Sequence, residues 1–137
     1  YSPYSGVISI FINQALSGEP ITVNGDGKQT RSMIFVGDVA RATTRAGEVT
    51  EAHGKTINIG GTDEITILEL AEKVKDLMPD TSSHIVHTEA RTGDIRQSIA
   101  STELARKVLS FKPQVSLEEG LKRTIDWYRL NPQDLTM

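Results

Sequence analysis

Apolar residues recur at three- and four-residue spacing near the start of the chain, which is the spacing of one face of an α-helix. These residues are Val7, Ile8, Phe11, Ile12, Ala15 and Leu16. Gly18 follows them, and glycine commonly ends a helix because it accepts a positive φ. The pattern therefore predicts a helix over residues 6–17 that packs on one face.

A strand and a tight turn are predicted next. Ile21 and Val23 alternate with polar residues, as a half-buried strand requires. Two turn dipeptides, Asn24-Gly25 and Asp26-Gly27, come directly after them. The apolar run 33–36 is short enough for a second strand. Asp38 then stands where an N-cap is expected, which predicts a helix over roughly 38–50.

The middle of the chain contains one strong local signal. Thr66 and Glu69 form a capping box, in which each side chain bonds the other residue's backbone amide. The helix that it opens has one apolar stripe and ends at Pro79. Before it, residues 56–59 predict a short strand with a glycine stop, and after it, residues 84–87 alternate like an exposed or edge strand.

The last third predicts a charged loop and two helices. The loop covers residues 91–96, and Ser101 or Thr102 caps the helix that follows it. Ser116 begins a second capping box and a final helix, which Asn131-Pro132 closes. The last five residues are expected to fray.

Composition narrows the class of protein. At 137 residues the chain is one domain at most, or a fragment of one, and it can bury a real core. No apolar run approaches the ~20 residues of a membrane span. A net charge of −3 argues against a general nucleic-acid binder. The absence of cysteine excludes disulfides and thiolate metal sites and fits a reducing, cytoplasmic compartment.

Three charged residues could bind an anionic ligand. Arg31 follows the glycine turn, and a guanidinium can hold two phosphate oxygens at once without ever losing its proton. The alternative is a surface arginine paired with Asp26 or Asp38. Arg91 and Asp94 share a loop and suit a ligand with phosphates and ribose hydroxyls, the alternative being a solvated salt bridge.

The order of these motifs resembles the NAD-dependent nucleotide-sugar epimerase/dehydratase family, the extended short-chain dehydrogenases. The likeness lies in the glycine turn followed by Arg31 and by Asp38-Val39-Ala40, and in four further segments. These are residues 2–11, 57–61, 91–94 and 116–121. The resemblance covers nearly the whole chain and is closest to members like UDP-glucose 4-epimerase. It implies a mixed α/β fold of about five helices with short strands, the C-terminal substrate-binding lobe without the main Rossmann sheet.

The resemblance also implies roles for individual residues. Arg31 and Arg91 would hold the diphosphate of a nucleoside-diphosphate sugar, and Asp94 would reach the ribose or the sugar. Arg96 is a further candidate cation. The family lays the nucleotide base against the positions of Thr22 and Asn24, and its ligand approaches the helix start at Gly6 and Val7. The position of Asn24 is commonly aromatic in the family, so here it can hydrogen-bond a base but cannot stack on it.

Other signals do not support a site. Residues 25–30 lack the third glycine of a dinucleotide loop, and Gln29 stands where a P-loop needs serine or threonine. His84 and His87 would point to opposite faces of a strand, so no metal site is predicted. Trp127 and Tyr128 in the last helix are interpreted as packing groups.

The family's hydride chemistry needs a dinucleotide loop and a Tyr-x-x-x-Lys pair, and neither occurs in this sequence. We therefore expect no NAD and no turnover from this chain alone, with NAD held by the rest of a full-length enzyme. The resemblance predicts the sugar-nucleotide-binding part of an epimerase. The alternatives are a dehydratase or decarboxylase of the same family, and a non-catalytic binding or interaction module. We further expect the isolated chain to form homo-oligomers through exposed strand edges.

Overall fold

The computed structural model describes residues 6–131 and has, within that range, five α-helices, one 3₁₀ helix and five short strands. This confirms the predicted fold class. The described residues form two compact units. The first contains residues 6–29, 66–96 and 121–131, and the second contains residues 30–65 and 97–120. That residues 1–137 are a single domain or a fragment of one stays a prediction, and the expected fraying of the last five residues lies outside the described range.

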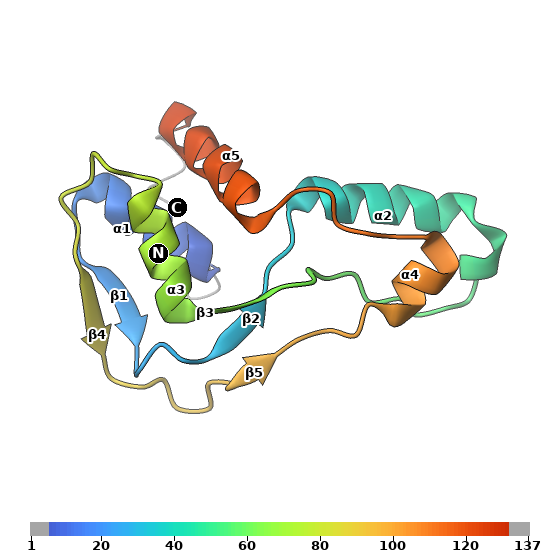
Figure 1. Ribbon diagram of the computed structural model, residues 1–137, viewed down its shortest axis with the longest axis horizontal. Helices are drawn as coiled ribbons and strands as arrows, with labels where there is room; N and C mark the ends of the chain where they lie inside the picture. The colour runs from blue at the N-terminus through green and yellow to red at the C-terminus, as the bar shows by residue number, and fades with distance from the viewer. Residues whose placement is uncertain (1–5, 132–137) are drawn as a thin grey trace. The chain divides into compact units, whose positions relative to one another are not determined.

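In the first unit, two helices cover a pair of parallel strands (Figure 1). The strands are β1 (Ile21–Asn24) and β4 (Ile85–Thr88), in a register that pairs Ile21 with Ile85. The helices α1 (Val7–Ser17) and α3 (Ile67–Asp76) contact each other and β1. Both helices and both strands were expected from the sequence pattern.

The core of the first unit comes from the predicted apolar stripes. Its fully buried side chains include Phe11, Ile12, Ile21, Val23, Leu70, Val74, Met78 and Ile125. The capping box at the start of α3 is confirmed: Glu69 N donates to Thr66 Oγ1 over 3.1 Å, and Thr66 N donates to Glu69 Oε2 over 2.9 Å. Ile125 belongs to α5 (Leu117–Leu130), the predicted last helix, whose first turn is capped by Ser116.

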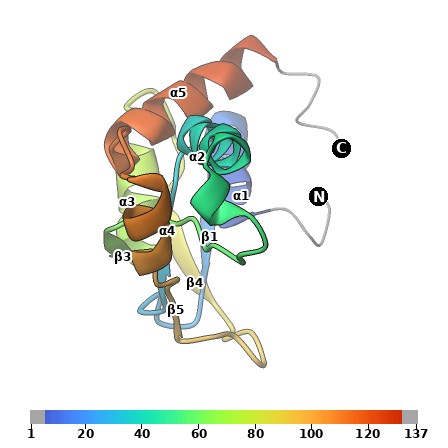
Figure 2. The same cartoon turned by 90° about the vertical axis from the view of Figure 1, so that its right-hand side faces the viewer.

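The second unit has helices around a small alanine-rich core. Helix α2 (Val36–Glu48), the 3₁₀ helix η1 (Thr50–Ala52) and α4 (Glu103–Leu109) contact one another. Figure 2 shows α2 nearly end-on with α4 beside it. The strands β2 (Thr30–Ser32), β3 (Glu64–Thr66) and β5 (Gln97–Ser98) make one sheet in the order β3-β2-β5, and β2 runs parallel to β5. The buried core residues of this unit are Ala42, Ala52, Ala105, Leu109 and Phe111.

Two predictions about the start of α2 are wrong. The run 33–36 is not a strand, because the ladder of β2 ends at Ser32 and Val36 already belongs to α2. Asp38 is not the N-cap: the extended residue Phe35 takes that position, and Asp38 lies inside the first turn. Its buried carboxylate instead accepts hydrogen bonds from the backbone of Gln114 and Val115.

The predicted strand at residues 56–59 is also not assigned. Within the described chain, no other segment hydrogen-bonds to the backbone of these residues, and a strand needs such a partner to exist as a ladder. Ile57 and Ile59 still pack against the core of the second unit. The segment therefore has the side-chain pattern of a strand but not the pairing.

Candidate functional site

The glycine turn after β1 is held in one conformation by several contacts. Gly25 and Gly27 have φ values of 65° and 69°, which residues other than glycine rarely adopt. A Cβ on Gly27 would come within 2.7 Å of Val23 and 2.9 Å of Leu68. Leu68 N also donates to Gly27 O over 3.0 Å. The turn is thus packed closely against the start of α3, and only glycine fits at position 27.

A second loop, residues 89–96, begins at the carboxyl end of β4, just as the glycine turn begins at the carboxyl end of β1. Parallel pairing places the carboxyl ends of β1 and β4 together, and ligands of open α/β folds bind outside such ends. Gly25 N donates to Thr88 O over 3.0 Å, and a Cβ on Gly25 would lie 3.3 Å from the Cβ of Ala90. Inside the loop, Asp94 N donates to Arg91 O over 3.1 Å. The glycine turn and the charged loop therefore lie against each other.

Together, the turn and the loop line a hollow of about 380 Å³. Its lining residues are Asn24, Gly25, Asp26, Gln29, Ala90, Arg91, Asp94 and Arg96. Three of the seven predicted site residues, Asn24, Arg91 and Asp94, are brought together here. The exposed Arg91 side chain makes no hydrogen bond or ion pair with the residues that the structure describes. A cation without a partner beside a glycine turn can accept an anionic group.

The amide of Asn24 is already oriented. Thr88 Oγ1 donates to Asn24 Oδ1 over 2.9 Å, so the amide nitrogen is the part left to donate to a ligand. The main-chain oxygen of Asn24 accepts a bond of 3.2 Å from Gln29 Nε2. This position therefore presents a hydrogen-bond donor to the hollow.

The other predicted residues lie elsewhere. Thr22 is tied to Gln14, which donates from Nε2 to Thr22 Oγ1 over 2.8 Å and accepts from Thr22 N over 3.0 Å. Gly6 is the N-cap of α1, and Val7 is its first residue. Arg31 lies in β2, in the second unit, where it donates to Thr30 O over 2.8 Å. A shared role for Arg31 and Arg91 stays a prediction.

Sequence reasoning missed two features of the hollow. Gln29 is only 6% exposed although it is polar, and it holds the turn closed through its bond to Asn24. Arg96, considered as an extra cation, is instead paired with Asp26 through bonds of 2.9 and 3.1 Å. The carboxylates that the sequence offered as partners for Arg31 thus bind other arginines, since Asp38 pairs with Arg41. The Asp26–Arg96 pair joins positions 70 residues apart, so no local sequence signal could have revealed it.

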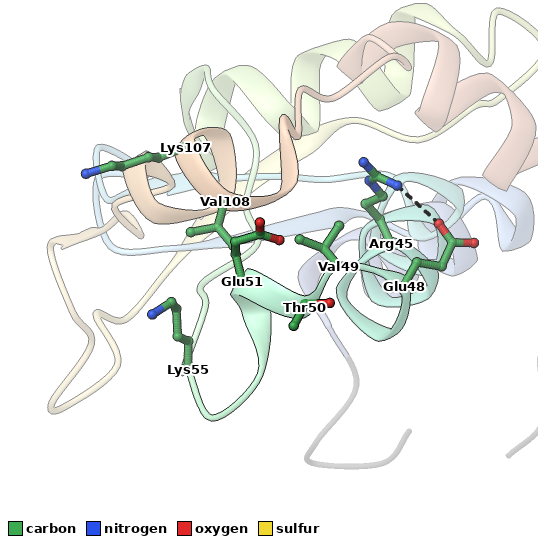
Figure 3. Close-up of a pocket in the computed structure, with 8 residues that line it drawn as sticks. All are labelled: Arg45, Glu48, Val49, Thr50, Glu51, Lys55, Lys107 and Val108. Carbon is green, nitrogen blue, oxygen red and sulfur yellow. Dashed lines mark hydrogen bonds and ion pairs between the residues drawn. The ribbon is translucent and has the colours of Figure 1, made fainter.

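A second hollow occurs in the second unit (Figure 3). It is open and about 740 Å³ in volume. Residues at or near the ends of α2, η1 and α4 line it, among them Arg45 and Glu48, which form an ion pair of 3.4 Å. None of the predicted site residues lines it. Across residues 6–131, no three histidine or acidic side chains are grouped as a metal site would require. Nor does any described helix have the length and apolarity to cross a membrane.

Comparison with known proteins agrees with the order of the motifs. The profile of the NAD dependent epimerase/dehydratase family matches residues 1–60. A UDP-N-acetyl-alpha-D-glucosaminuronate decarboxylase from Bacillus cytotoxicus is 39% identical over 133 residues, which cover 93% of this chain and 41% of that protein. Residues 1–60 thus match the NAD-dependent epimerase/dehydratase family, and nearly the whole chain is similar to a UDP-sugar decarboxylase.

Members of the epimerase/dehydratase family with a different named activity are similar as well. A UDP-glucose 4-epimerase from Mycolicibacterium smegmatis is 34% identical, with 94% of this chain and 41% of that protein covered. The crystal structure of UDP-glucose 4-epimerase with UDP-glucose from Thermotoga maritima superposes with a TM-score of 0.87 at 34% identity. That match covers 96% of this chain and 42% of the other. The chain therefore spans about two fifths of the length of these relatives.

The glycine turn of this chain does not have the form of a dinucleotide-binding loop, which the cofactor in the family's name would need. A dinucleotide is held where a strand runs through three glycines into a helix N-terminus. Here the glycine turn has two glycines, Gly25 and Gly27, and it connects β1 to another strand, β2, rather than to a helix. We assign no contact with NAD to these residues and derive no step through it.

Proposed function

We propose that this chain binds the nucleoside-diphosphate sugar in an NAD-dependent epimerase, most like UDP-glucose 4-epimerase. The observation that carries the proposal is the hollow at the carboxyl ends of β1 and β4. It is lined by the carboxylate Asp94 and by Arg91, whose side chain has no hydrogen bond or ion pair among the described residues. NAD and the residues that transfer hydride would belong to the rest of such an enzyme. The absence of cysteine supports a cytoplasmic setting for the reaction.

Each residue in the hollow has a task in this proposal. Arg91 would bind the diphosphate, because a guanidinium matches two phosphate oxygens in one plane. Asp94 would accept hydrogen bonds from ribose or sugar hydroxyls. Asn24 would donate to the carbonyl of a base such as uracil. Arg31 is proposed as the second phosphate contact, and Thr22, Gly6 and Val7 as further ligand contacts on the strength of the family resemblance.

Decarboxylation of a sugar acid is the second candidate reaction. The observation that favours it is the identity of 39% with a UDP-sugar decarboxylase, against 34% with a UDP-glucose 4-epimerase. An epimerase substrate site should bind UDP-glucose at least as well as UDP-glucuronic acid. A decarboxylase site should prefer the acid. Measuring both affinities on the same chain discriminates the two candidates, and a dehydratase of the same family remains the third.

Isothermal titration with UDP, dTDP and GDP tests whether the chain binds a nucleotide at all. We expect UDP to bind best, and we expect Arg91→Gln to weaken it by ten- to a hundredfold. That loss corresponds to the roughly 1.5–3 kcal/mol of a hydrogen bond to a charged group. Arg31→Gln should weaken binding in the same direction.

The matched control is Arg106→Gln, which removes an exposed arginine of α4 that does not line the hollow. This variant should bind UDP like the unchanged chain. Absence of binding by all three nucleotides would leave a non-catalytic interaction module as the better account. Equal losses in Arg91→Gln and Arg106→Gln would reduce the effect to overall charge.

Self-association is proposed from residues 56–60. Their backbone groups lack hydrogen-bond partners among the described residues, and an open strand-like edge recruits another strand. Light scattering should therefore show a dimer or larger species. Asn58→Pro should shift it to monomer because proline removes a donor from the edge, whereas Asn58→Ala should not. A clean monomer at high concentration of the unchanged chain would contradict the proposal.

A further inference from the structure

The two arginines of the 89–96 loop are in different states. Arg91 makes no hydrogen bond or ion pair with any described residue, whereas Arg96 places both terminal nitrogens on the carboxylate of Asp26. The two bonds of 2.9 and 3.1 Å form the planar, two-pronged pair in which guanidinium and carboxylate match best. One cation is thus available to a ligand while the other is already bound within the protein.

The Asp26–Arg96 pair closes the loop at its far end. The near end is fixed by β4, through the bond from Gly25 N to Thr88 O and the contact between Gly25 and Ala90. Arg96 is the last residue of the first unit before the chain enters β5. The five residues between Ala90 and Arg96 include Arg91 and Asp94, so both are held between two anchor points on the glycine turn.

Stability does not account for this pair. The side chains of Arg96 and Asp26 are 67% and 47% exposed, and ion pairs so open to water contribute little to folding. Hydrogen bonds from Arg96 and from the backbone of Lys28 lower the pKa of Asp26 to about 2. The carboxylate therefore stays charged at any pH used in an assay, and the pair does not act as a pH switch.

We propose that Asp26 and Arg96 are positioning residues: their ion pair holds the 89–96 loop so that Arg91 and Asp94 face the bound nucleotide. The inference rests on the proposed function for its ligand. Its physical basis is preorganisation, since a loop already fixed in its bound form loses less conformational entropy when the ligand arrives.

Asp26→Asn separates this role from simple electrostatics by the sign of its effect. Asparagine keeps the oxygen that accepts the 3.0 Å bond from Lys28 N, so the turn itself is preserved. The variant removes a negative charge from the hollow, and electrostatics alone would then make a nucleoside diphosphate such as UDP bind more tightly. Loss of the clamp predicts the reverse, about fivefold weaker binding of UDP and at least fivefold faster hydrogen exchange of the amides in 89–96.

The control is Asp80→Asn, which breaks an exposed ion pair of 2.7 Å with Arg129 in the same unit. It should change neither UDP affinity nor exchange in the loop. Unchanged or tighter binding together with unchanged exchange in Asp26→Asn would overturn the proposal. If the unchanged chain binds no UDP, the proposed function fails, and the exchange rates of the loop alone decide whether the clamp exists.

Discussion

Gly61→Ala is expected to destabilise the protein by about 3 kcal/mol, at the upper end of what overpacking normally costs. A Cβ at this position would overlap the carbonyl oxygen of Met33, and it would lie 2.9 Å from the carbonyl carbon of Met33 and 3.1 Å from Ser32 Oγ. Two of these atoms belong to the backbone and cannot move aside as a side chain could. Ser32 Oγ also donates to Gly61 O over 2.7 Å, so separating the two segments breaks that bond as well.

Urea denaturation followed by circular dichroism measures the effect, and Gly47→Ala is its control. Gly47 lies exposed in α2, and a Cβ there has nothing within 4 Å. Alanine should stabilise that helix by up to ~1 kcal/mol, because it restricts the backbone more than glycine does. The same chemical change should thus have opposite signs at the two positions. A Gly61→Ala variant as stable as the unchanged protein would contradict the packing described for this unit.

Asp38→Asn is expected to cost about 3 kcal/mol, in the range found when one partner of a buried, hydrogen-bonded charge is removed. The Asp38 side chain is fully buried. One oxygen accepts from Gln114 N over 3.0 Å and Val115 N over 3.1 Å, and the other lies 2.7 Å from Arg41. Arg41 in turn donates to Lys112 O over 2.9 Å. These contacts attach the segment before α5 to α2, and an asparagine cannot replace them all.

The same carboxylate should make stability depend on pH. Burial alone would raise the pKa of Asp38, but hydrogen bonds from Val115, Gln114 and Arg41 outweigh it and lower the pKa below its ordinary value. A lowered pKa in the folded state stabilises the fold above the unfolded pKa of about 3.9, and this contribution is lost as the pH falls through the folded pKa. Urea midpoints measured from pH 7 downward should fall below about pH 4 in the unchanged protein.

The urea midpoint of Asp38→Asn should fall less below about pH 4 than that of the unchanged protein, because the variant lacks this carboxylate. The control is Glu48→Gln, which breaks an exposed ion pair of 3.4 Å on the same helix and should leave stability unchanged at every pH. Equal stability of Asp38→Asn and Glu48→Gln at pH 7 would show that the buried carboxylate contributes nothing.

Features encoded by neighbours in the sequence were predictable. The capping box of Thr66 and Glu69 needs only a three-residue spacing, and the structure forms both of its bonds. The turn at Gly25 and Gly27 follows from the conformations that glycine permits, and both residues have positive φ. The apolar stripe of α3 likewise identified the side chains that the core buries.

Features that depend on distant partners were not predictable. Asp38 looks like an N-cap locally, but its hydrogen-bond partners lie 76 and 77 positions further on. Residues 56–59 have the composition of a strand, yet pairing decides whether one forms. In the candidate site, Arg91 and Asp94 were identified by motif, while the Asp26–Arg96 pair joins positions 70 residues apart. Sequence patterns thus identified three residues that line the hollow, but not the contacts that hold them in place.

The most direct test of the proposed nucleotide site is a UDP titration of the ¹⁵N-labelled chain followed by amide chemical shifts. The account predicts that the largest changes fall on the segments 24–29 and 90–96, which contain the residues that line the hollow around Arg91 and Asp94. They should be absent in Arg91→Gln at the same UDP concentration. Changes confined to the open hollow around Arg45 and Lys107, or no changes at all, would contradict it.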